Sequence, residues 1–182
     1  MQRLAWLLAA GALVAAPPQR YEVKRAASPI QIDGKADEPA WEAAGKIEVP
    51  APSPTTVRLL WDDNFLYLAF ECEDSDSVVI QIHPKPPQTD AYIGLEIDRR
   101  ATGRAFLRVG EYVFRQFHLQ GVRLSTYVEG HAWTAEVAIP WNNFDDLSRQ
   151  HGAGSTWTAN WGRGSAAPQP PLDQFGELVF VK

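Results

Sequence analysis

The chain has 182 residues, which is enough for one ordinary domain and short for two. Apolar residues make up 45% of it and charged residues 21%, a composition typical of globular rather than disordered proteins. The 22 acidic residues outnumber the 17 basic ones. The net charge of −5, without any long run of like charge, argues against nucleic acid or a membrane surface as the partner.

The N-terminal segment has the pattern of a secretory signal peptide. It begins with the basic Met1–Arg3, continues as the uncharged run Leu4–Ala16, and reaches prolines at positions 17 and 18. The run is shorter than the ~20 residues that a membrane-spanning helix needs. We therefore predict that residues 1–16 are a signal peptide and that the mature protein is secreted or periplasmic, without membrane contact. The alternative is an uncleaved membrane anchor.

Helical periodicity is scarce, and the one short helix that we expect lies near the N-terminus, over residues 37–44. Asp37 can cap it through its side-chain oxygen, and proline at position 39 is tolerated in a first turn. Trp41 would hold this helix against the rest of the fold.

Period-two alternation dominates the remaining chain, which predicts β-strands. Residues 57–61 lead into a hairpin turn at Asp62-Asp63-Asn64, and residues 65–72 form the returning strand. One side of that strand is expected to hold Leu66, Leu68, Phe70 and Cys72. Cys72 is the only cysteine, so no intramolecular disulfide can form, and we expect it to be a small core residue.

The next strand pair is expected over residues 90–98 and 105–109, joined by a turn at 99–103. Alternation places one set of side chains toward the core: Ala91, Ile93, Leu95, Ile97, Ala105, Leu107 and Val109. It places another set toward solvent: Asp90, Tyr92, Gly94, Glu96, Asp98, Phe106 and Arg108.

Further strands are expected at 112–119, 123–128, 156–161 and 177–181, and between them at 133–141. In that stretch Trp133 and Trp141 share a face with Val137 and Ile139, while Thr134 and Glu136 lie on the polar face. The two tryptophans could instead form an exposed stacking platform for a sugar. Burial with aliphatic partners in register is the favoured interpretation.

Seven to ten short strands and one short N-terminal helix predict an all-β fold, an antiparallel β-sandwich of the immunoglobulin or jelly-roll type. There is no internal repeat and no change of composition along the chain. We therefore expect one domain over residues 20–182.

Several short blocks resemble the family 9 carbohydrate-binding modules, which belong to the DOMON-like β-sandwiches. The blocks stand in family order and cover nearly the whole mature chain: residues 32–41, 57–63, 66–70, 133–141, 154–157 and 175–180. The resemblance implies a sugar site in which two tryptophans clamp a sugar, helped by a carboxylate, an arginine and amide groups. Arg108 matches the arginine, whereas Gly94 stands at the carboxylate position and neither clamp tryptophan is found. The sequence thus predicts an altered sugar site.

The candidate carbohydrate-binding residues are those of the outward face, which combines aromatic rings with charged groups: Tyr92, Glu96, Phe106 and Arg108. Trp161 and Arg163 are secondary candidates, although Trp161 has the parity of the core residues Trp157 and Ala159. The alternative is a cross-strand Arg–Glu pair flanked by ordinary surface aromatics.

No cofactor is expected, although the resemblance makes structural calcium possible at acidic turns such as 62–63, 73–76 and 145–146. The metal ligands stay unassigned, and the histidines at 83, 118, 131 and 151 lack the pairing of a zinc site. Some DOMON-like domains carry haem on a methionine, but the only methionine here is Met1; a His–His or His–Lys pair stays open.

No catalytic signature is present, and Glu96 and Glu136 lie in no recognisable glycosidase motif. The function predicted is a secreted, non-catalytic, monomeric domain that binds a polysaccharide or oligosaccharide and is associated with polysaccharide degradation, at most as an accessory to a glycoside hydrolase. The alternatives are a structural accessory domain of the cell envelope and a haem-binding electron carrier.

Overall fold

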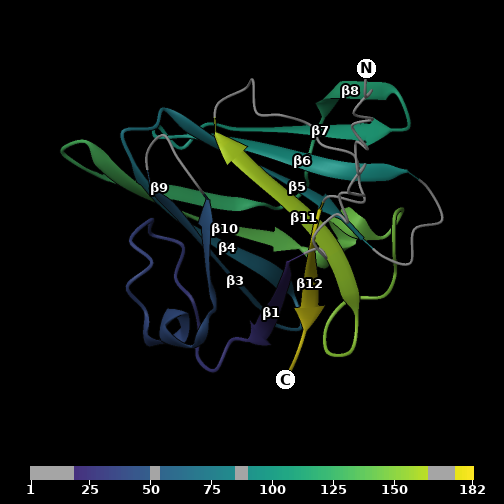
Figure 1. Cartoon of the computed structure of the whole chain (residues 1–182), viewed down its shortest axis with the longest axis horizontal. Helices are drawn as coiled ribbons and strands as arrows, with labels where there is room; N and C mark the ends of the chain where they lie inside the picture. The colour runs from purple at the N-terminus through teal and green to yellow at the C-terminus, as the bar shows by residue number, and fades with distance from the viewer. Residues whose placement is uncertain (1–18, 50–53, 85–89, 164–174) are drawn as a thin grey trace, which may run out of the picture.

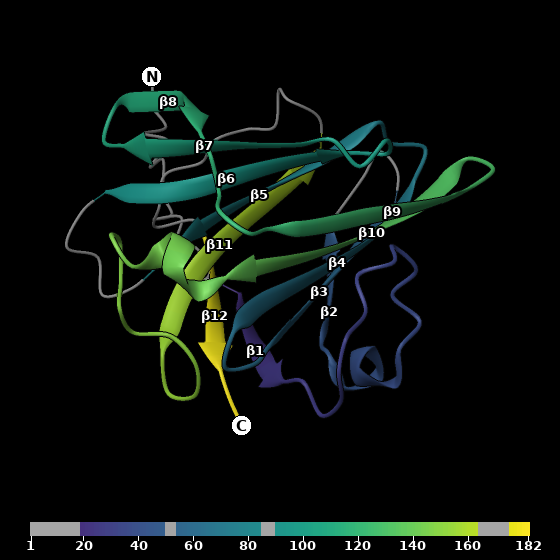
Figure 2. The ribbon, with the colours of Figure 1, turned by 180° about the vertical axis from the view of Figure 1, so that it is seen from behind.

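The fold is built almost entirely from β-strands that form two facing sheets (Figures 1 and 2). A computed structural model describes residues 19–49, 54–84, 90–163 and 175–182. The first sheet has the order β8 (Tyr112–Phe117), β7 (Gly103–Val109), β6 (Ala91–Asp98), β5 (Ser77–His83), β11 (Thr156–Arg163) and β12 (Gly176–Phe180). The second has the order β3 (Thr55–Trp61), β4 (Phe65–Glu73), β10 (Ala132–Pro140) and β9 (Arg123–Glu129), with β2 (Lys46–Val49) paired to β3.

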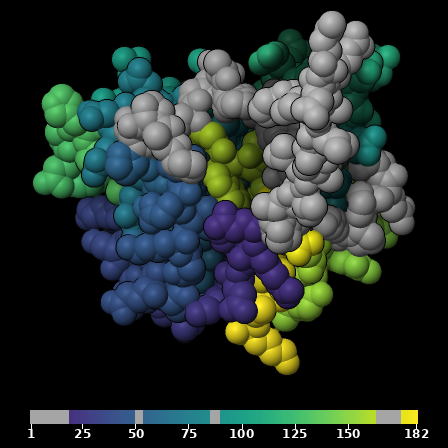
Figure 3. Space-filling model, viewed as in Figure 1, coloured from purple at the N-terminus to yellow at the C-terminus, as the bar shows by residue number. Residues whose placement is uncertain are grey.

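Strand β1 (Arg20–Arg25) joins the two sheets because each of its halves belongs to a different one. Residues 20–23 pair in parallel with β12, and residues 24–25 pair in parallel with β3. Figure 3 shows the purple β1 beside the yellow β12. The sandwich is therefore antiparallel except at this junction, which alternation along a single strand cannot predict.

The described residues contain twelve strands, more than the seven to ten expected. The sequence prediction missed β1, β2 and β5. All seven residues of β5 are buried: Val78, Ile80 and Ile82 belong to the main core and alternate with Ser77, Val79, Gln81 and His83 on the other face, a period-two pattern that the sequence prediction overlooked. The predicted signal peptide lies outside the described residues, and within them no helix is long and apolar enough to cross a membrane.

The main core lies between the two sheets and confirms the predicted alternation. From the first sheet it takes Ile93, Leu95 and Ile97, and from the second it takes the four predicted residues of β4, Leu66, Leu68, Phe70 and Cys72. Val109 is an exception, since it was expected to face the core and is 39% exposed. It ends β7 beside the edge strand β8, whose residues 112–116 are also exposed.

The two tryptophans of the 133–141 stretch are core residues, as predicted. Trp133 is 1% exposed and Trp141 is 5% exposed. Strand β10 ends at Pro140, so Trp141 begins the short 3-10 helix η2 (Trp141–Phe144) rather than ending the strand. Its indole Nε1 donates to the carbonyl of Asp62 at 2.8 Å, which satisfies the polar atom that burial removes from water.

A second apolar cluster lies on the outer face of the second sheet, where the short 3-10 helix η1 (Pro39–Ala43) covers β3, β4 and β10. Trp41 is 1% exposed and holds this element to the sheet, as predicted. The predicted cap is wrong: Glu38 occupies the N-cap position, and no side-chain hydrogen bond caps the helix.

Glu136, expected on a polar face, is fully buried beneath this cover. Its Oε2 accepts from the backbone N–H of Asp33 at 3.1 Å and of Gly34 at 2.8 Å, and its Oε1 accepts from Trp41 Nε1 at 2.9 Å. Burial raises the pKa of Glu136, although the hydrogen bonds from Gly34 and Trp41 act in the opposite direction. The side chain thus anchors the 33–41 segment to β10, and no carbohydrate can reach it.

Gly34 is required where this segment meets the sheet. Its φ is 96°, and an added Cβ would lie 2.6 Å from the carbonyl carbon of Thr126 in β9. Any side chain at this position would be strained and would collide with backbone. Close packing against β9 therefore explains why glycine follows Asp33 in the family-like block at residues 32–41.

Candidate functional site

The outward-facing residues of β6 and β7 form one row, which we call the outer row. The two strands pair antiparallel, as expected, and place three cross-strand pairs on this face: Tyr92 with Arg108, Gly94 with Phe106, and Glu96 with Arg104. Four of these six residues are the predicted candidates. Glu96 and Arg108 are not opposite each other, because the Gly94–Phe106 pair separates them.

Tyr92 supports the row from beneath instead of presenting a free ring. It was expected to face solvent, but it is only 3% exposed. The rings of Phe106 and Phe175 lie 6.3 and 5.6 Å from its centroid. These contacts bury the aromatic face that a sugar would need.

Arg108 crosses the Tyr92 ring with its guanidinium carbon 5.8 Å from the ring centroid. Its Nη1 donates to the hydroxyl of Tyr92 at 3.4 Å, and its Nε donates to the carbonyl of Gly110 at 2.8 Å. The side chain is half-buried. These contacts fix its position, so that the guanidinium is preorganised at the surface.

Phe106 occupies the centre of the row because its cross-strand partner has no side chain. A Cβ added at Gly94 would lie 1.9 Å from Cζ of Phe106, so the ring lies directly over the glycine. Phe106 itself is only half-buried. It is therefore the aromatic ring of the row that keeps accessible surface.

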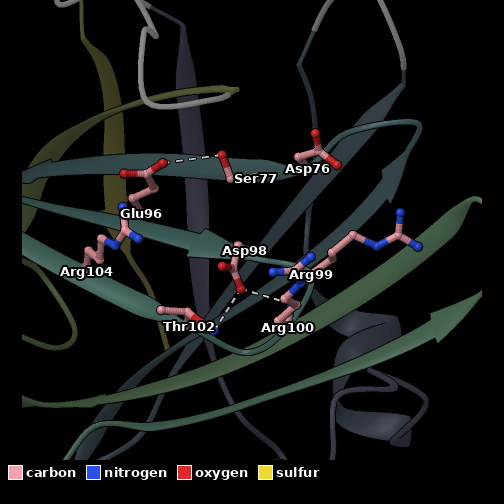
Figure 4. A pocket seen from close by; sticks show the side chains of 8 residues that line it. All are labelled: Asp76, Ser77, Glu96, Asp98, Arg99, Arg100, Thr102 and Arg104. Atoms are coloured by element: carbon pink, nitrogen blue, oxygen red, sulfur yellow. Dashed lines mark hydrogen bonds between the residues drawn. The ribbon is translucent and has the colours of Figure 1, made fainter.

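A polar pocket of about 310 Å³ opens at the Glu96 end of the row (Figure 4). Glu96 and Arg104 contribute from the row, and the Oγ of Ser77 in β5 donates to Oε1 of Glu96 at 3.4 Å. The rest of the lining comes from the start of β5 and from the β6–β7 turn: Asp76, Asp98, Arg99, Arg100 and Thr102. Carboxylates and guanidinium groups thus face a common space.

Asp98 organises the turn at the rim of this pocket. Its Oδ1 accepts from the backbone N–H groups of Arg100 and Thr102, each at 2.9 Å (Figure 4). Partial burial raises the pKa of Asp98, but the hydrogen bonds from Thr102 and Arg100 outweigh it and leave the pKa below its usual range. Asp98 is therefore ionised under neutral conditions and holds the turn in shape.

The secondary candidates do not join the row. Trp161 is partly buried against the main core and meets the ring of Tyr21 edge-on at 5.1 Å. It pairs with the core residue Ile80 of β5, in line with its core parity. The backbone of Arg163 pairs with Val78, and its side chain lies outside the described part of the structure.

On β5 and β11, the outer face of the first sheet carries polar side chains that are buried. Gln81, His83 and Thr158 are at most 4% exposed. Asn160 donates to Gln81 at 2.9 Å, and His83 Nδ1 lies 3.3 Å from the hydroxyl of Thr158. Among the described residues of this sheet face, the outer row and its pocket are where a partly accessible aromatic ring lies beside charged groups.

The acidic turn at 62–63, one of the turns considered for calcium, makes contacts within the protein. Asp62 accepts from the N–H groups of Asn64 and Phe65 and from the hydroxyl of Tyr67, each at 2.8 Å, while Asp63 pairs with Arg25. Within the described residues, no group of three His, Cys, Asp or Glu side chains is placed to hold a metal ion.

The sequence analysis missed Arg104 and Ser77. Arg104 has the parity of Phe106 and Arg108, so extending the alternation by one step toward the turn would have found it. Ser77 has the parity opposite to the core residues Val78, Ile80 and Ile82, so the same alternation would have placed it outward had β5 been predicted.

Solved structures with this architecture include a candidate carbohydrate-binding protein from Bacteroides uniformis. It has a TM-score of 0.69 and 15% identity over 90% of this chain and 99% of its own. A family 9 carbohydrate-binding module from Caldicellulosiruptor kristjanssonii in complex with cellotriose has a TM-score of 0.64 and 15% identity, over 90% of this chain and 94% of its own. The fold is that of a family 9 carbohydrate-binding module.

The complex of a Caldicellulosiruptor kristjanssonii family 9 module with glucose agrees, with a TM-score of 0.63 and 16% identity over 89% of this chain and 95% of that one. The sequence matches no family profile and no curated protein. The family 9 fold confirms the resemblance and the β-sandwich expected from the sequence, and at such identities the likeness concerns the fold alone.

Proposed function

We propose that the protein is a non-catalytic carbohydrate-binding domain, whose sugar contacts lie on the outer row and in the adjoining pocket. The observation that carries the proposal is the half-buried Phe106 ring, set between the fixed guanidinium of Arg108 and the polar pocket at Glu96 and Arg104. The family 9 fold supports it, because modules with that fold were solved with cellotriose and glucose.

The chemistry of the row matches that of a sugar. A pyranose has apolar ring faces, which pack on an aromatic ring, and hydroxyl groups, which both donate and accept hydrogen bonds. Phe106 supplies the ring, Glu96 accepts from hydroxyls, and Arg104 and Arg108 donate to them. A pocket of about 310 Å³ is at the small end of ligand sites, which suits the end of a glycan or a short stretch of it.

This site differs from the one that the family resemblance implies. The carboxylate position of that site falls on Gly94, and Phe106 fills the space above it. A carboxylate there would collide with the ring, so the charged contacts move along the strands to Glu96 and Arg104. We infer an altered sugar site, with one aromatic contact in place of a two-tryptophan clamp.

Binding without catalysis is the role best supported by the carboxylates. A glycosidase needs one carboxylic acid with a raised pKa beside a second carboxylate. Asp98 neighbours Glu96 in the pocket, but its pKa is lowered, and Glu136 is fully buried. We also propose, from the pattern of residues 1–16, that the domain acts outside the cytoplasm, where polysaccharides are degraded.

The test is binding of short cellulose and xylan oligosaccharides by isothermal titration calorimetry, backed by affinity electrophoresis on the polymers. Phe106→Ala and Arg108→Ala should each weaken binding at least about tenfold, the loss of about 1.4 kcal/mol. Matched controls are Tyr127→Ala, an exposed aromatic of β9, and Arg149→Ala, an exposed arginine. Neither control should change the affinity.

Three outcomes contradict the proposal. Undiminished binding by the Phe106 and Arg108 variants would move the site elsewhere. A protein that binds no member of a broad glycan array would favour a structural role in the cell envelope. A Soret band in the purified protein would favour a haem carrier.

A further inference from the structure

Strand β8 is an apolar edge. Within the described residues it pairs with β7 and with no other strand, so one row of its backbone N–H and C=O groups is unpaired. Three of its side chains are nevertheless apolar and exposed, Tyr112 by 73%, Val113 by 38% and Phe114 by 53%, and they are followed by the exposed polar Arg115 and Gln116. Soluble proteins normally protect such edges with charge, proline or a covering element, because an open apolar edge pairs with another strand.

The β7–β8 hairpin fixes which residues of β8 turn their backbone toward that open edge. The turn is Gly110-Glu111, with Gly110 at a φ of 56°, and Val109 pairs with Tyr112 on either side of it. Residues flanking a two-residue turn exchange both hydrogen bonds, and bonded pairs alternate along an antiparallel ladder. Tyr112 and Phe114 therefore bond to β7, while Val113 turns its N–H and C=O to the open edge. The register shifts after Phe114, because the next pair is Ala105 with Phe117, so Arg115 and Gln116 form a bulge in β8.

We propose that a second copy of this chain covers the edge, with two β8 strands pairing antiparallel about a two-fold axis at Val113. In this register Val113 faces its own copy as a hydrogen-bonded pair. Glu111 faces Arg115 of the other copy, and Tyr112 faces Phe114. Each of these two contacts occurs twice by symmetry, so the edge is complementary to itself in charge and in aromatic character.

Neighbouring registers lack this complementarity. An axis at Phe114 sets Glu111 against Phe117 and Val113 against Arg115, which pairs each charge with an apolar group. An axis at Arg115 sets two arginines directly opposite, which is unfavourable. Glu111 and Arg115 are both exposed, so that either is available for a partner.

The dimer would join the two first sheets into one continuous sheet. A two-fold axis normal to the sheet leaves both outer rows on the same side. Arg108 pairs with Val113, so the arginines of the two copies flank the axis across three strand spacings, about 14 Å apart. The two candidate sites then face one polysaccharide surface together, and a long chain that reaches both is retained by avidity. This inference stands without the sugar proposal, and it replaces the monomer expected from the sequence.

Analytical ultracentrifugation of charge variants tests the partner and the register. Arg115→Glu sets like charges opposite at two positions, as does Glu111→Arg, and each should weaken the dimer about tenfold or more. The double variant with both changes restores opposite charges and should dimerise as the wild type does. Arg149→Glu, which makes the same charge change elsewhere, should have no effect. A monomeric wild type at high micromolar concentration, or a double variant as weak as the single ones, would overturn the proposal.

Cysteine cross-linking gives an independent readout of the register. Facing residues of a hydrogen-bonded pair have Cα atoms about 5.5 Å apart, within the range of a disulfide. Val113→Cys should therefore form a covalent dimer rapidly under mild oxidation. Tyr112→Cys, whose counterpart lies two residues out of register, should not. Cys72 is 2% exposed and does not interfere. Equal cross-linking rates for the two variants would contradict this register.

Discussion

Replacing Glu136 by glutamine tests how the segment that carries η1 is held to the second sheet. All three groups around the carboxylate are donors: the backbone N–H groups of Asp33 and Gly34 and the indole Nε1 of Trp41. Glutamine is nearly isosteric but has one oxygen. If that oxygen keeps the two backbone donors, its amide group must face the indole N–H, which lies 2.9 Å from the carboxylate oxygen now.

The cost follows from these contacts. A hydrogen bond to a charged group contributes about 1.5–3 kcal/mol, and a buried donor left without an acceptor costs about 1–3 kcal/mol. Removing the buried charge offsets part of this, in line with the raised pKa of Glu136. We expect the free energy of unfolding to fall by about 2–3 kcal/mol, which lowers Tm by about 5–10 °C for a domain of this size.

The assay is urea and thermal unfolding of Glu136→Gln, with the exposed Glu129→Gln as the matched control. Trp41→Phe removes the indole donor, so in that background the glutamine should cost about 1–2 kcal/mol less. Strict additivity of the Glu136 and Trp41 substitutions would refute the reasoning. So would a Glu136→Gln protein as stable as its Glu129→Gln control.

Two further predictions concern the outer row and the pocket. Gly94→Ala should displace the Phe106 ring and so lower both the stability and the glycan affinity. The same substitution should be tolerated in a Phe106→Ala background. Equal destabilisation in both backgrounds, measured by thermal unfolding, would contradict the ring placement. Because the folded-state pKa of Asp98 is lowered, its ionised form adds stability above its unfolded pKa, and this is lost as the pH falls through the folded value. The Tm of Asp98→Asn should therefore lie below that of the wild type at neutral pH and approach it as the pH falls through the folded pKa of Asp98, and a gap that is constant with pH would contradict this.

The sequence was enough to predict which residues of a strand face the core. It was not enough to predict which segments cover the outer faces of the two sheets. Alternation correctly assigned Ile93, Leu95 and Ile97 to the core, because apolar and polar side chains alternate along a strand that has one buried and one solvent-exposed face. Alternation also placed Tyr92 and Glu136 on the outer faces of the sheets, and both were therefore expected to contact solvent. Both are buried, because Phe175 packs on the first and the 33–41 segment lies on the second. Those contacts link residues far apart in sequence and have no periodic signal.

The site was predictable in the same partial sense. The outward parity of Phe106 and Arg108 identified the row, and pairing of the two strands followed from the short turn between them. The pocket was not predicted, because one part of its wall, Asp76 and Ser77, comes from the start of the unpredicted strand β5 and the residue before it. Strand β5 was not predicted, although Val78, Ile80 and Ile82 have the parity of core residues and Ser77 has the outward parity.

The shared strand β1 has a consequence for how this protein acquires its structure. Its partner β12 is the last strand of the chain, so the two halves of the sandwich are closed by the contact of greatest sequence separation. Nucleation must precede that closure, and synthesis of residues 176–180 must precede it too. Removal of β12 should therefore leave β1 and β11 as exposed, aggregation-prone margins.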